Sequence, residues 1–426
     1  MIVDMDCALA GGASSPVRAG RAVGGTPFVQ SRGDGAYAYD AHGRRYIDYV
    51  MAYGPLLLGH AHPALTTGLT ELAARGTVFG STCPGEAELA ERMRGHLPSM
   101  ERVRFTTTGS EAVMSAVRVA RAFTGRDVVL KFSGNYHGHF DAALLDAGAS
   151  AHTVSAAAAG IPRSVASDVV VARYNDLDSV ERATARCSDR LAAILVEPVV
   201  GNMGLVVPND GFLAALRAHT HACGALLIFD EVITWLRLGL NGAQARAGVR
   251  PDLTAVGKIV GGGLPLAAFG GRRDVMALLA PDGPAFTGGT HAGNPLAVAV
   301  ALRVLDWLES HPGAYAVMER QARRLAGGLR AELAALNLDY AVVQLASIVD
   351  FKFRSGPRTR DYDDMRRADP AAFAAFYHAM RQRGVLLAPS QNEVMFLSTE
   401  HSDADIDATL DAAHASLREL RAGGIV

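Results

Sequence analysis

Short apolar runs alternate with longer amphipathic segments over residues 61–300 of the chain. Apolar residues at helical spacing predict helices at 111–123, 211–221 and 295–310. The apolar runs predict strands at 103–106, 128–132, 169–172, 192–197, 225–230, 253–256 and 267–270. Strands that alternate with helices are typical of an α/β fold with a mostly parallel central sheet and helices on both faces.

The two ends of the chain show different patterns. Residues 1–60 are Gly-rich and irregular, with short strands predicted at 36–39 and 46–49. Near 313–336 a long helical stretch begins the C-terminal part, which predicts strands near 342–353 and 394–398 and helices near 370–383 and 403–422. We expect an N-terminal arm over 1–60, a large domain over 61–300 and a smaller α+β domain over 301–426.

Composition narrows the class of protein. The 426 residues include 41 Lys+Arg and 43 Asp+Glu, with a net charge of −2 and 49% hydrophobic residues, which argues against disorder and against nucleic-acid binding. No apolar run approaches the roughly 20 residues that span a bilayer, and the N-terminus lacks a basic leader. Cys7, Cys83, Cys187 and Cys223 are scattered without a C-x-x-C pair, so neither a disulfide framework nor a zinc site is indicated. We expect a cytoplasmic protein.

Ligands of open parallel sheets bind at the carboxyl ends of the strands, so the residues that follow each predicted strand are the candidates for a binding site. Thr107-Thr108-Gly109-Ser110-Glu111 follows the 103–106 strand and opens a predicted helix. The free N–H groups and the dipole of a helix start favour a phosphate. The alternative is that Ser110 only caps the helix.

A second candidate is Asp230, at the end of an apolar strand and followed by Glu231. An Asp there can pair with a protonated ring nitrogen, a magnesium ion or an arginine. The chain has no G-x-x-x-x-G-K-[ST] sequence, which argues against a P-loop nucleotide site.

Lysine is rare, and Lys131, Lys258 and Lys352 are the only three in the sequence. Lys131 and Lys352 lie inside predicted strands and are expected to face solvent. Lys258 follows the 253–256 strand and precedes a glycine run, where desolvation would favour the neutral amine that forms a Schiff base. The alternative is a lysine that extends from a buried strand end to solvent.

The segment Ser133-Gly134-Asn135-Tyr136-His137-Gly138-His139 follows the 128–132 strand. His137 and His139 have the spacing of a metal pair, as do His60 and His62, but no Cys or acid cluster completes either set. A Tyr136 ring that stacks on a planar cofactor is the better interpretation, and no metal is expected.

A phosphate site, a stacking Tyr, an Asp for a ring nitrogen and a Schiff-base Lys are together what pyridoxal 5′-phosphate (PLP) requires. The chain resembles the class III, fold-type I PLP-dependent aminotransferases, and within them the glutamate-1-semialdehyde 2,1-aminomutases. The likeness runs through Ser15-Pro16-Val17-Arg18, Gly59-His60-Ala61-His62-Pro63, Gly242-Ala243-Gln244, Gly293-Asn294-Pro295 and Ala388-Pro389-Ser390-Gln391.

The resemblance implies roles for individual residues. Gly109 and Ser110 would bind the cofactor phosphate, with Thr290 arriving from the second subunit of a homodimer. Tyr136 and Val232 would cover the two ring faces, Asp230 would keep the ring nitrogen protonated, and Lys258 would form the Schiff base and shuttle a proton. The positions of His137, Glu197 and Asn202 also match pocket residues of the family.

The resemblance also bears on the substrate, a small amino compound. Ser15, Arg18 and Tyr53 would line its site, with Arg18 on the carboxylate and Glu393 near the amine. Tyr53 stands where the family usually has Trp, Gly20 where it has Phe, and residues 148–153 depart from its gating loop. The expected reaction is the aminomutase exchange between adjacent carbons, using the PLP and PMP (pyridoxamine phosphate) forms of the cofactor. The alternative is an aminotransferase acting on a β- or ω-amino substrate.

Overall fold

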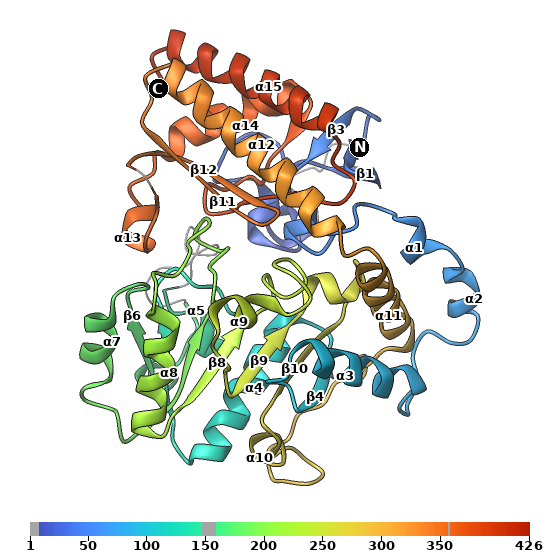
Figure 1. Ribbon diagram of the computed structural model, residues 1–426, viewed down its shortest axis with the longest axis vertical. Coiled ribbons are helices and arrows are strands. Elements are labelled where there is room, and N and C mark those ends of the chain that lie inside the picture. Colours follow the sequence, from blue (N-terminus) through green and yellow to red (C-terminus); the bar gives the residue numbers. More distant parts are fainter. Residues whose placement is uncertain (1–7, 147–158, 357) are drawn as a thin grey trace.

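A seven-stranded sheet forms the centre of the larger of two lobes (Figure 1). Its described strands all run in one direction except β10, which is antiparallel to both of its neighbours, β4 and β9. The order is β4 (Arg102–Thr106), β10 (Ala267–Gly271), β9 (Leu253–Val256), β8 (Leu226–Asp230), β7 (Leu191–Val196), β5 (Val128–Phe132) and β6 (Val169–Ala172). All seven predicted strands are found, each within one residue of its predicted ends.

Helices cover both faces of this sheet, which confirms the predicted α/β fold. On β7, Ala193 and Leu195 pack in the cluster that includes α4 (Gly109–Thr124), whereas Ile194 and Val196 pack in the cluster that includes α8 (Phe212–Cys223). Successive side chains of a strand point to opposite faces, so a strand covered on both sides is apolar throughout. This is why an inner strand such as β7 appears in the sequence as an unbroken apolar run.

The computed structural model describes residues 8–146, 159–356 and 358–426. Within them no helix is both long and apolar enough to cross a membrane. The other helices of the larger lobe and the linking segments are α1 (Pro63–Thr66), α2 (Leu69–Ala73), α3 (Pro84–His96), α5 (Asp141–Leu144), α6 (Arg163–Ser167), α7 (Leu177–Thr184), α9 (Gly242–Ala247), α10 (Arg273–Met276) and α11 (Pro295–Ser310). Cys7 and the predicted gating segment 148–153 lie outside the described residues.

The C-terminal part of the chain builds the smaller lobe. Its antiparallel sheet consists of β11 (Tyr340–Leu345), β12 (Ile348–Ser355) and β14 (Met395–Phe396). The strand expected near 342–353 is therefore a hairpin, and the one expected near 394–398 is only two residues long. The helices are α12 (Ala314–Ala335), α13 (Tyr362–Met365), α14 (Pro370–Gln382) and α15 (Asp403–Ala422).

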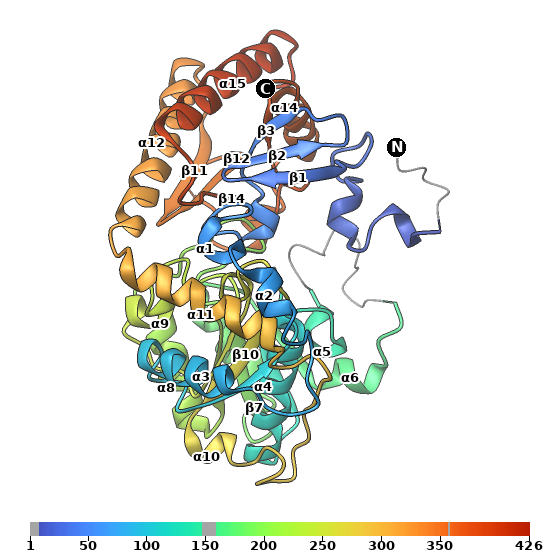
Figure 2. The ribbon, with the colours of Figure 1, turned by 90° about the vertical axis from the view of Figure 1, so that its right-hand side faces the viewer.

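The N-terminal strands also lie in the smaller lobe (Figure 2). β1 (Gln30–Asp34), β2 (Tyr37–Asp40) and β3 (Arg45–Asp48) form an antiparallel sheet, and β13 (Val385–Leu386) adds to β3 in parallel. β1 was not expected because it is mostly exposed and lacks an apolar face. The domain boundaries at residues 60 and 300 stay a prediction.

Candidate functional site

A cavity of about 360 Å³ lies at the carboxyl ends of the central strands. Residues that follow or end β4, β5, β7, β8 and β9 line it, together with parts of the N-terminal segment and the loop before β14. All the predicted site residues except Thr290 line this cavity: Ser15, Arg18, Tyr53, Gly109, Ser110, Tyr136, His137, Glu197, Asn202, Asp230, Val232, Lys258 and Glu393. Thr290 is exposed and lies elsewhere on the surface.

The start of α4 faces the cavity with its own cap already in place. The Thr108 hydroxyl accepts a hydrogen bond from the Glu111 N–H at 3.2 Å, and the Glu111 carboxylate accepts from the Thr108 N–H at 2.9 Å. This is a capping box on Thr108. Ser110 is therefore not the cap, and its hydroxyl lies 3.2 Å from His139 Nδ1.

Two glycines keep space open at this helix start. A Cβ on Gly109 would lie 3.0 Å from a methyl group of Val232, and a Cβ on Gly138 would lie 2.4 Å from the Ser110 hydroxyl oxygen. The backbone can approach a ligand closely only where these side chains are missing. Free N–H groups at the positive end of a 16-residue helix, beside a hydroxyl, fit the phosphate of PLP.

Asp230 is buried at the end of β8, and His137 holds it. His137 Nδ1 lies 2.8 Å from Asp230 Oδ2, and the Val232 N–H donates to Oδ1 at 3.1 Å. Burial lowers the pKa of His137, while its hydrogen bond to Asp230 acts in the opposite direction. Between these neighbours, the carboxylate has the environment needed to pair with a protonated ring nitrogen.

One histidine of each pair with metal-ligand spacing contacts a carboxylate. His60 Nε2 lies 2.8 Å from Asp48 Oδ2, just as His137 lies against Asp230. Across the described ranges no group of three or more His, Cys, Asp or Glu is placed to hold a metal ion.

Glu197 is buried beside the cavity and accepts three hydrogen bonds. The Tyr136 N–H donates to Oε1 at 2.9 Å, and the Gly201 N–H and the Asn202 amide donate to Oε2 at 3.0 and 2.9 Å. Burial, assisted by the charge of Asp230, raises the pKa of Glu197 to about 8. Glu197 thus fixes the backbone of the Tyr136 loop and the side chain of Asn202.

Lys258 follows β9 and extends its amine into the cavity, where Nζ donates to the Tyr53 carbonyl at 2.8 Å. Burial lowers the pKa of Lys258, and the carboxylates of Glu393, Glu197 and Asp230 act against that shift. An amine with a lowered pKa is more often neutral and therefore nucleophilic.

The other two lysines are buried, contrary to the expectation that they face solvent. Lys131 is 1% exposed, and its amine donates to the Ala143 and Leu145 carbonyls at 2.8 and 2.6 Å. Lys352 is 2% exposed and pairs with Asp350 at 2.6 Å. Each buried amine is tolerated because hydrogen-bond acceptors surround it, and burial lowers the pKa of Lys131 to about 7. Neither lysine lines the cavity.

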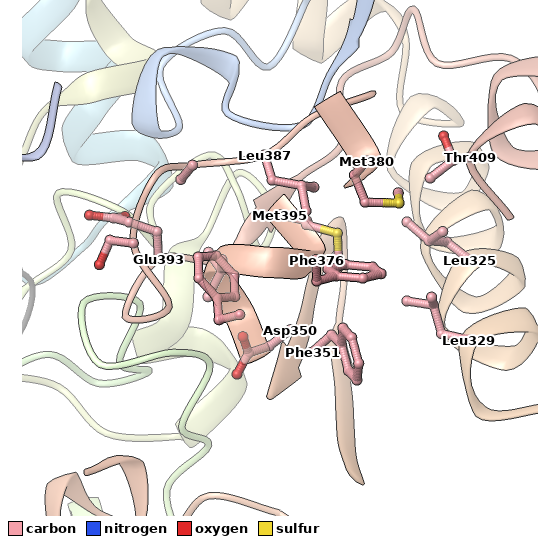
Figure 3. A pocket seen from close by; sticks show the side chains of 14 residues that line it. Leu325, Leu329, Asp350, Phe351, Phe376, Met380, Leu387, Glu393, Met395 and Thr409 are labelled. Atoms are coloured by element: carbon pink, nitrogen blue, oxygen red, sulfur yellow. The ribbon is translucent and has the colours of Figure 1, made fainter. Parts of the chain in front are cut away.

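Two charged residues that the sequence analysis assigned to the substrate, Arg18 and Glu393, both line the cavity. The Arg18 guanidinium is exposed and forms no hydrogen bond or ion pair with any described residue, so it is available to a carboxylate. Burial raises the pKa of Glu393. Glu393 also lines a second, mostly apolar cavity of about 30 Å³ in the smaller lobe, and Figure 3 shows its carboxylate directed away from Leu325 and Leu329.

Sequence reasoning missed Arg237, which is fully buried. Its guanidinium donates to the Gly54 carbonyl at 2.7 Å, the Leu397 carbonyl at 2.6 Å and the Ser347 hydroxyl at 3.1 Å. Burial lowers its pKa to about 9. The only feature of the sequence that could have indicated a buried Arg237 is its single charge inside the apolar stretch Trp235-Leu236-Arg237-Leu238.

Comparisons with known proteins agree with this geometry. The class-III aminotransferase family model matches residues 19–417. Glutamate-1-semialdehyde 2,1-aminomutase from Thermomicrobium roseum is 49% identical over 414 residues, which cover 97% of this chain and 96% of that protein.

Solved structures are similar over almost the whole chain. An omega-transaminase from Sphaerobacter thermophilus superposes with a TM-score of 0.89 at 33% identity, covering 97% of this chain and 95% of that one. A glutamate-1-semialdehyde aminomutase from Pseudomonas aeruginosa in complex with PMP superposes with a TM-score of 0.86 at 26% identity, covering 97% and 92%. The predicted fold type and cofactor are confirmed. This chain belongs to the class-III aminotransferase family and is a PLP-dependent enzyme.

Proposed function

We propose that the enzyme exchanges an amine and a carbonyl between adjacent carbons of a small amino aldehyde that carries a carboxylate, with glutamate-1-semialdehyde as the substrate. The observation that carries the proposal is the 49% identity, over nearly the full length of both chains, to a protein named glutamate-1-semialdehyde 2,1-aminomutase. A cavity of about 360 Å³ with a free guanidinium at one side suits a substrate of this size and charge.

The residues that line the cavity would have different roles in such a reaction. PLP supplies an aldehyde that carries the amino group and a ring that withdraws electrons from the reacting carbon. Gly109 and Ser110 would hold its phosphate, Tyr136 and Val232 would enclose its ring, and Asp230, held by His137, would keep a proton on the ring nitrogen.

Lys258 would bind the cofactor covalently and move the proton at its Nζ between a carbon of the substrate and a carbon of the cofactor. The space around this amine is shaped by Tyr53, Glu393 and Asn202, which all line the same cavity. Arg18 would hold the substrate carboxylate, with Ser15 beside it, and Glu393 would face the substrate amine.

We also propose that the enzyme is a homodimer in which Thr290 completes the phosphate site of the other subunit. Support comes from Thr290 being exposed and outside its own cavity, and from Phe286, four residues earlier, being 72% exposed. An exposed aromatic ring of this size is typical of an interface. Location in the cytoplasm stays a prediction.

Turnover without a partner substrate tests the reaction. Purified enzyme loaded with PMP is incubated with glutamate-1-semialdehyde, with and without an added keto-acid acceptor or amino donor. Full conversion to the isomer when neither is present supports the aminomutase. Strict dependence on an acceptor would contradict it.

An aminotransferase of β- or ω-amino substrates is the second candidate. It is favoured by the omega-transaminase from S. thermophilus, which is more similar to this chain in sequence than the solved P. aeruginosa aminomutase is, at 33% against 26% identity. Acceptor dependence in the same assay would identify this function.

A further inference from the structure

A left-handed turn forms part of the cavity wall. Met51, Ala52 and Tyr53 have φ values of 44°, 55° and 66°, and Gly54 follows at 112°. Residues with a side chain avoid this region because Cβ crowds the following carbonyl oxygen. Three such residues in succession persist only where the surrounding structure holds them.

Two buried charged side chains hold this turn, one at each end. Before the turn, the Asp48 carboxylate accepts hydrogen bonds from the Val50 and Met51 N–H groups at 2.7 and 3.2 Å. After it, Arg237 donates to the Gly54 carbonyl at 2.7 Å. Because the same guanidinium binds Ser347 and Leu397, it also ties the turn to the C-terminal part of the chain.

The carbonyls of the turn are directed by these contacts. Those of Val50 and Met51 accept from the Tyr53 and Gly54 N–H groups within the turn, at 2.8 and 3.0 Å. The Tyr53 carbonyl is directed at Lys258 and accepts from its Nζ at 2.8 Å. A Cβ on Gly54 would lie 3.6 Å from Lys258 Cδ, so the turn and the lysine chain are packed together.

We infer that the Tyr53 carbonyl is the docking point of the Lys258 amine whenever that amine is not bonded to the cofactor, and that Arg237 and Asp48 are positioning residues that aim this carbonyl. The inference rests on the proposed role of Lys258. Amino-group transfer releases the lysine amine and requires its return in each cycle. A docked amine returns faster than a free one because its rotamer freedom is already lost.

Chemical labelling of Lys258 in the cofactor-free protein tests this docking. The rate of reaction with an amine-specific reagent is read by peptide mass mapping. Arg237→Met and Asp48→Ala should each speed the labelling several-fold, because the amine loses its fixed acceptor. Since the two variants remove opposite charges, the direct effect of those charges on the pKa of Lys258 cannot account for a faster rate in both.

Two further variants serve as a partial rescue and as a control. Arg237→Lys should restore part of the slow labelling, because one ammonium can still reach the Gly54 carbonyl. Ser347→Ala is the matched control: it removes one hydrogen bond of Arg237, leaves the contact with Gly54, and should label at the parent rate. In the loaded enzyme, Arg237→Met and Asp48→Ala should lower kcat about tenfold and leave KM for glutamate-1-semialdehyde unchanged.

Parent-like labelling in both disruptive variants would overturn the docking role. If Arg237→Met does not fold, Asp48→Ala and Arg237→Lys decide the question. Borohydride reduction of the loaded enzyme, followed by peptide mapping, separates this inference from the proposed function. Cofactor found on Lys131 or Lys352 would overturn the role of Lys258, whereas cofactor on Lys258 with unchanged labelling would overturn the docking alone.

Discussion

At the scale of single residues, the chemistry depends on charges held in place by one or two neighbours. Asp230 is the clearest case, because the His137 ring and the Val232 N–H contact its two carboxylate oxygens and hold the carboxylate in one orientation. A carboxylate prevented from rotating can stabilise a charge on a bound ring without reorganising during the reaction.

Replacing Asp230 with Asn should lower kcat by roughly a hundredfold or more, about 3 kcal/mol of transition-state stabilisation, because a neutral amide does not favour a protonated ring nitrogen. The cofactor should still bind, since the phosphate contacts are untouched. Steady-state kinetics and the cofactor content after dialysis check both expectations. Near-normal kcat would mean that another acid holds the ring nitrogen.

Arg18 offers a second prediction at this scale. Arg18→Ala should raise KM for carboxylate-bearing substrates roughly ten- to a hundredfold, about 1.5–3 kcal/mol, and should hardly affect an amine that lacks a carboxylate. Arg18→Lys should recover only part of the loss, since an ammonium cannot form two parallel hydrogen bonds. An equal loss with both substrate types would instead indicate a structural role.

At the scale of elements, one buried ion pair joins β12 to two loops of the site. Lys352 pairs with Asp350 at 2.6 Å and donates to the carbonyls of Gln391 and Glu393, while Asp350 accepts from the Leu205 N–H at 3.0 Å. The pair therefore fixes the backbone beside both Glu393 and Asn202.

Breaking this pair should be costly. Lys352→Met should destabilise the protein by about 3–5 kcal/mol, because Asp350 is left as an unpaired buried charge. The double variant with Asp350→Leu should regain much of the loss, since no isolated charge remains. Chemical denaturation of the parent, both single variants and the double variant measures the coupling free energy. Simple additivity of the two single effects would show that the pair is not coupled.

At the scale of the whole molecule, the site is formed where the two lobes meet. Residues from the N-terminal segment, the larger lobe and the loop before β14 all line one cavity. The predicted dimer would add a fourth contribution through Thr290.

An interface variant tests that dimer. Phe286→Asp should shift the enzyme toward monomer in analytical ultracentrifugation and weaken retention of the cofactor, because an interface of this kind does not accept a buried carboxylate. Leu177→Asp is the control, since Leu177 is also exposed, at 41%, but lies on α7 at another surface. Unchanged sedimentation of the Phe286 variant at all concentrations would contradict the proposal.

The sequence by itself determined the central sheet and the location of most of the site. Strands covered on both faces appear as apolar runs, and a parallel sheet brings the residues after those runs to one edge. Asp230, Lys258 and Tyr136 could therefore be singled out from their position after a strand.

Only the tertiary structure decided where the remaining charges lie. Lys131, Lys352 and Arg237 occur in apolar stretches, and the sequence does not show whether such a charge reaches solvent or a partner. Their partners are up to 183 positions away, as for Arg237 and Gly54. The burial of a charge is set by the polar groups that the fold brings around it. Lys352 has one near partner, Asp350, but the carbonyls of Gln391 and Glu393 that complete its surroundings are distant in sequence.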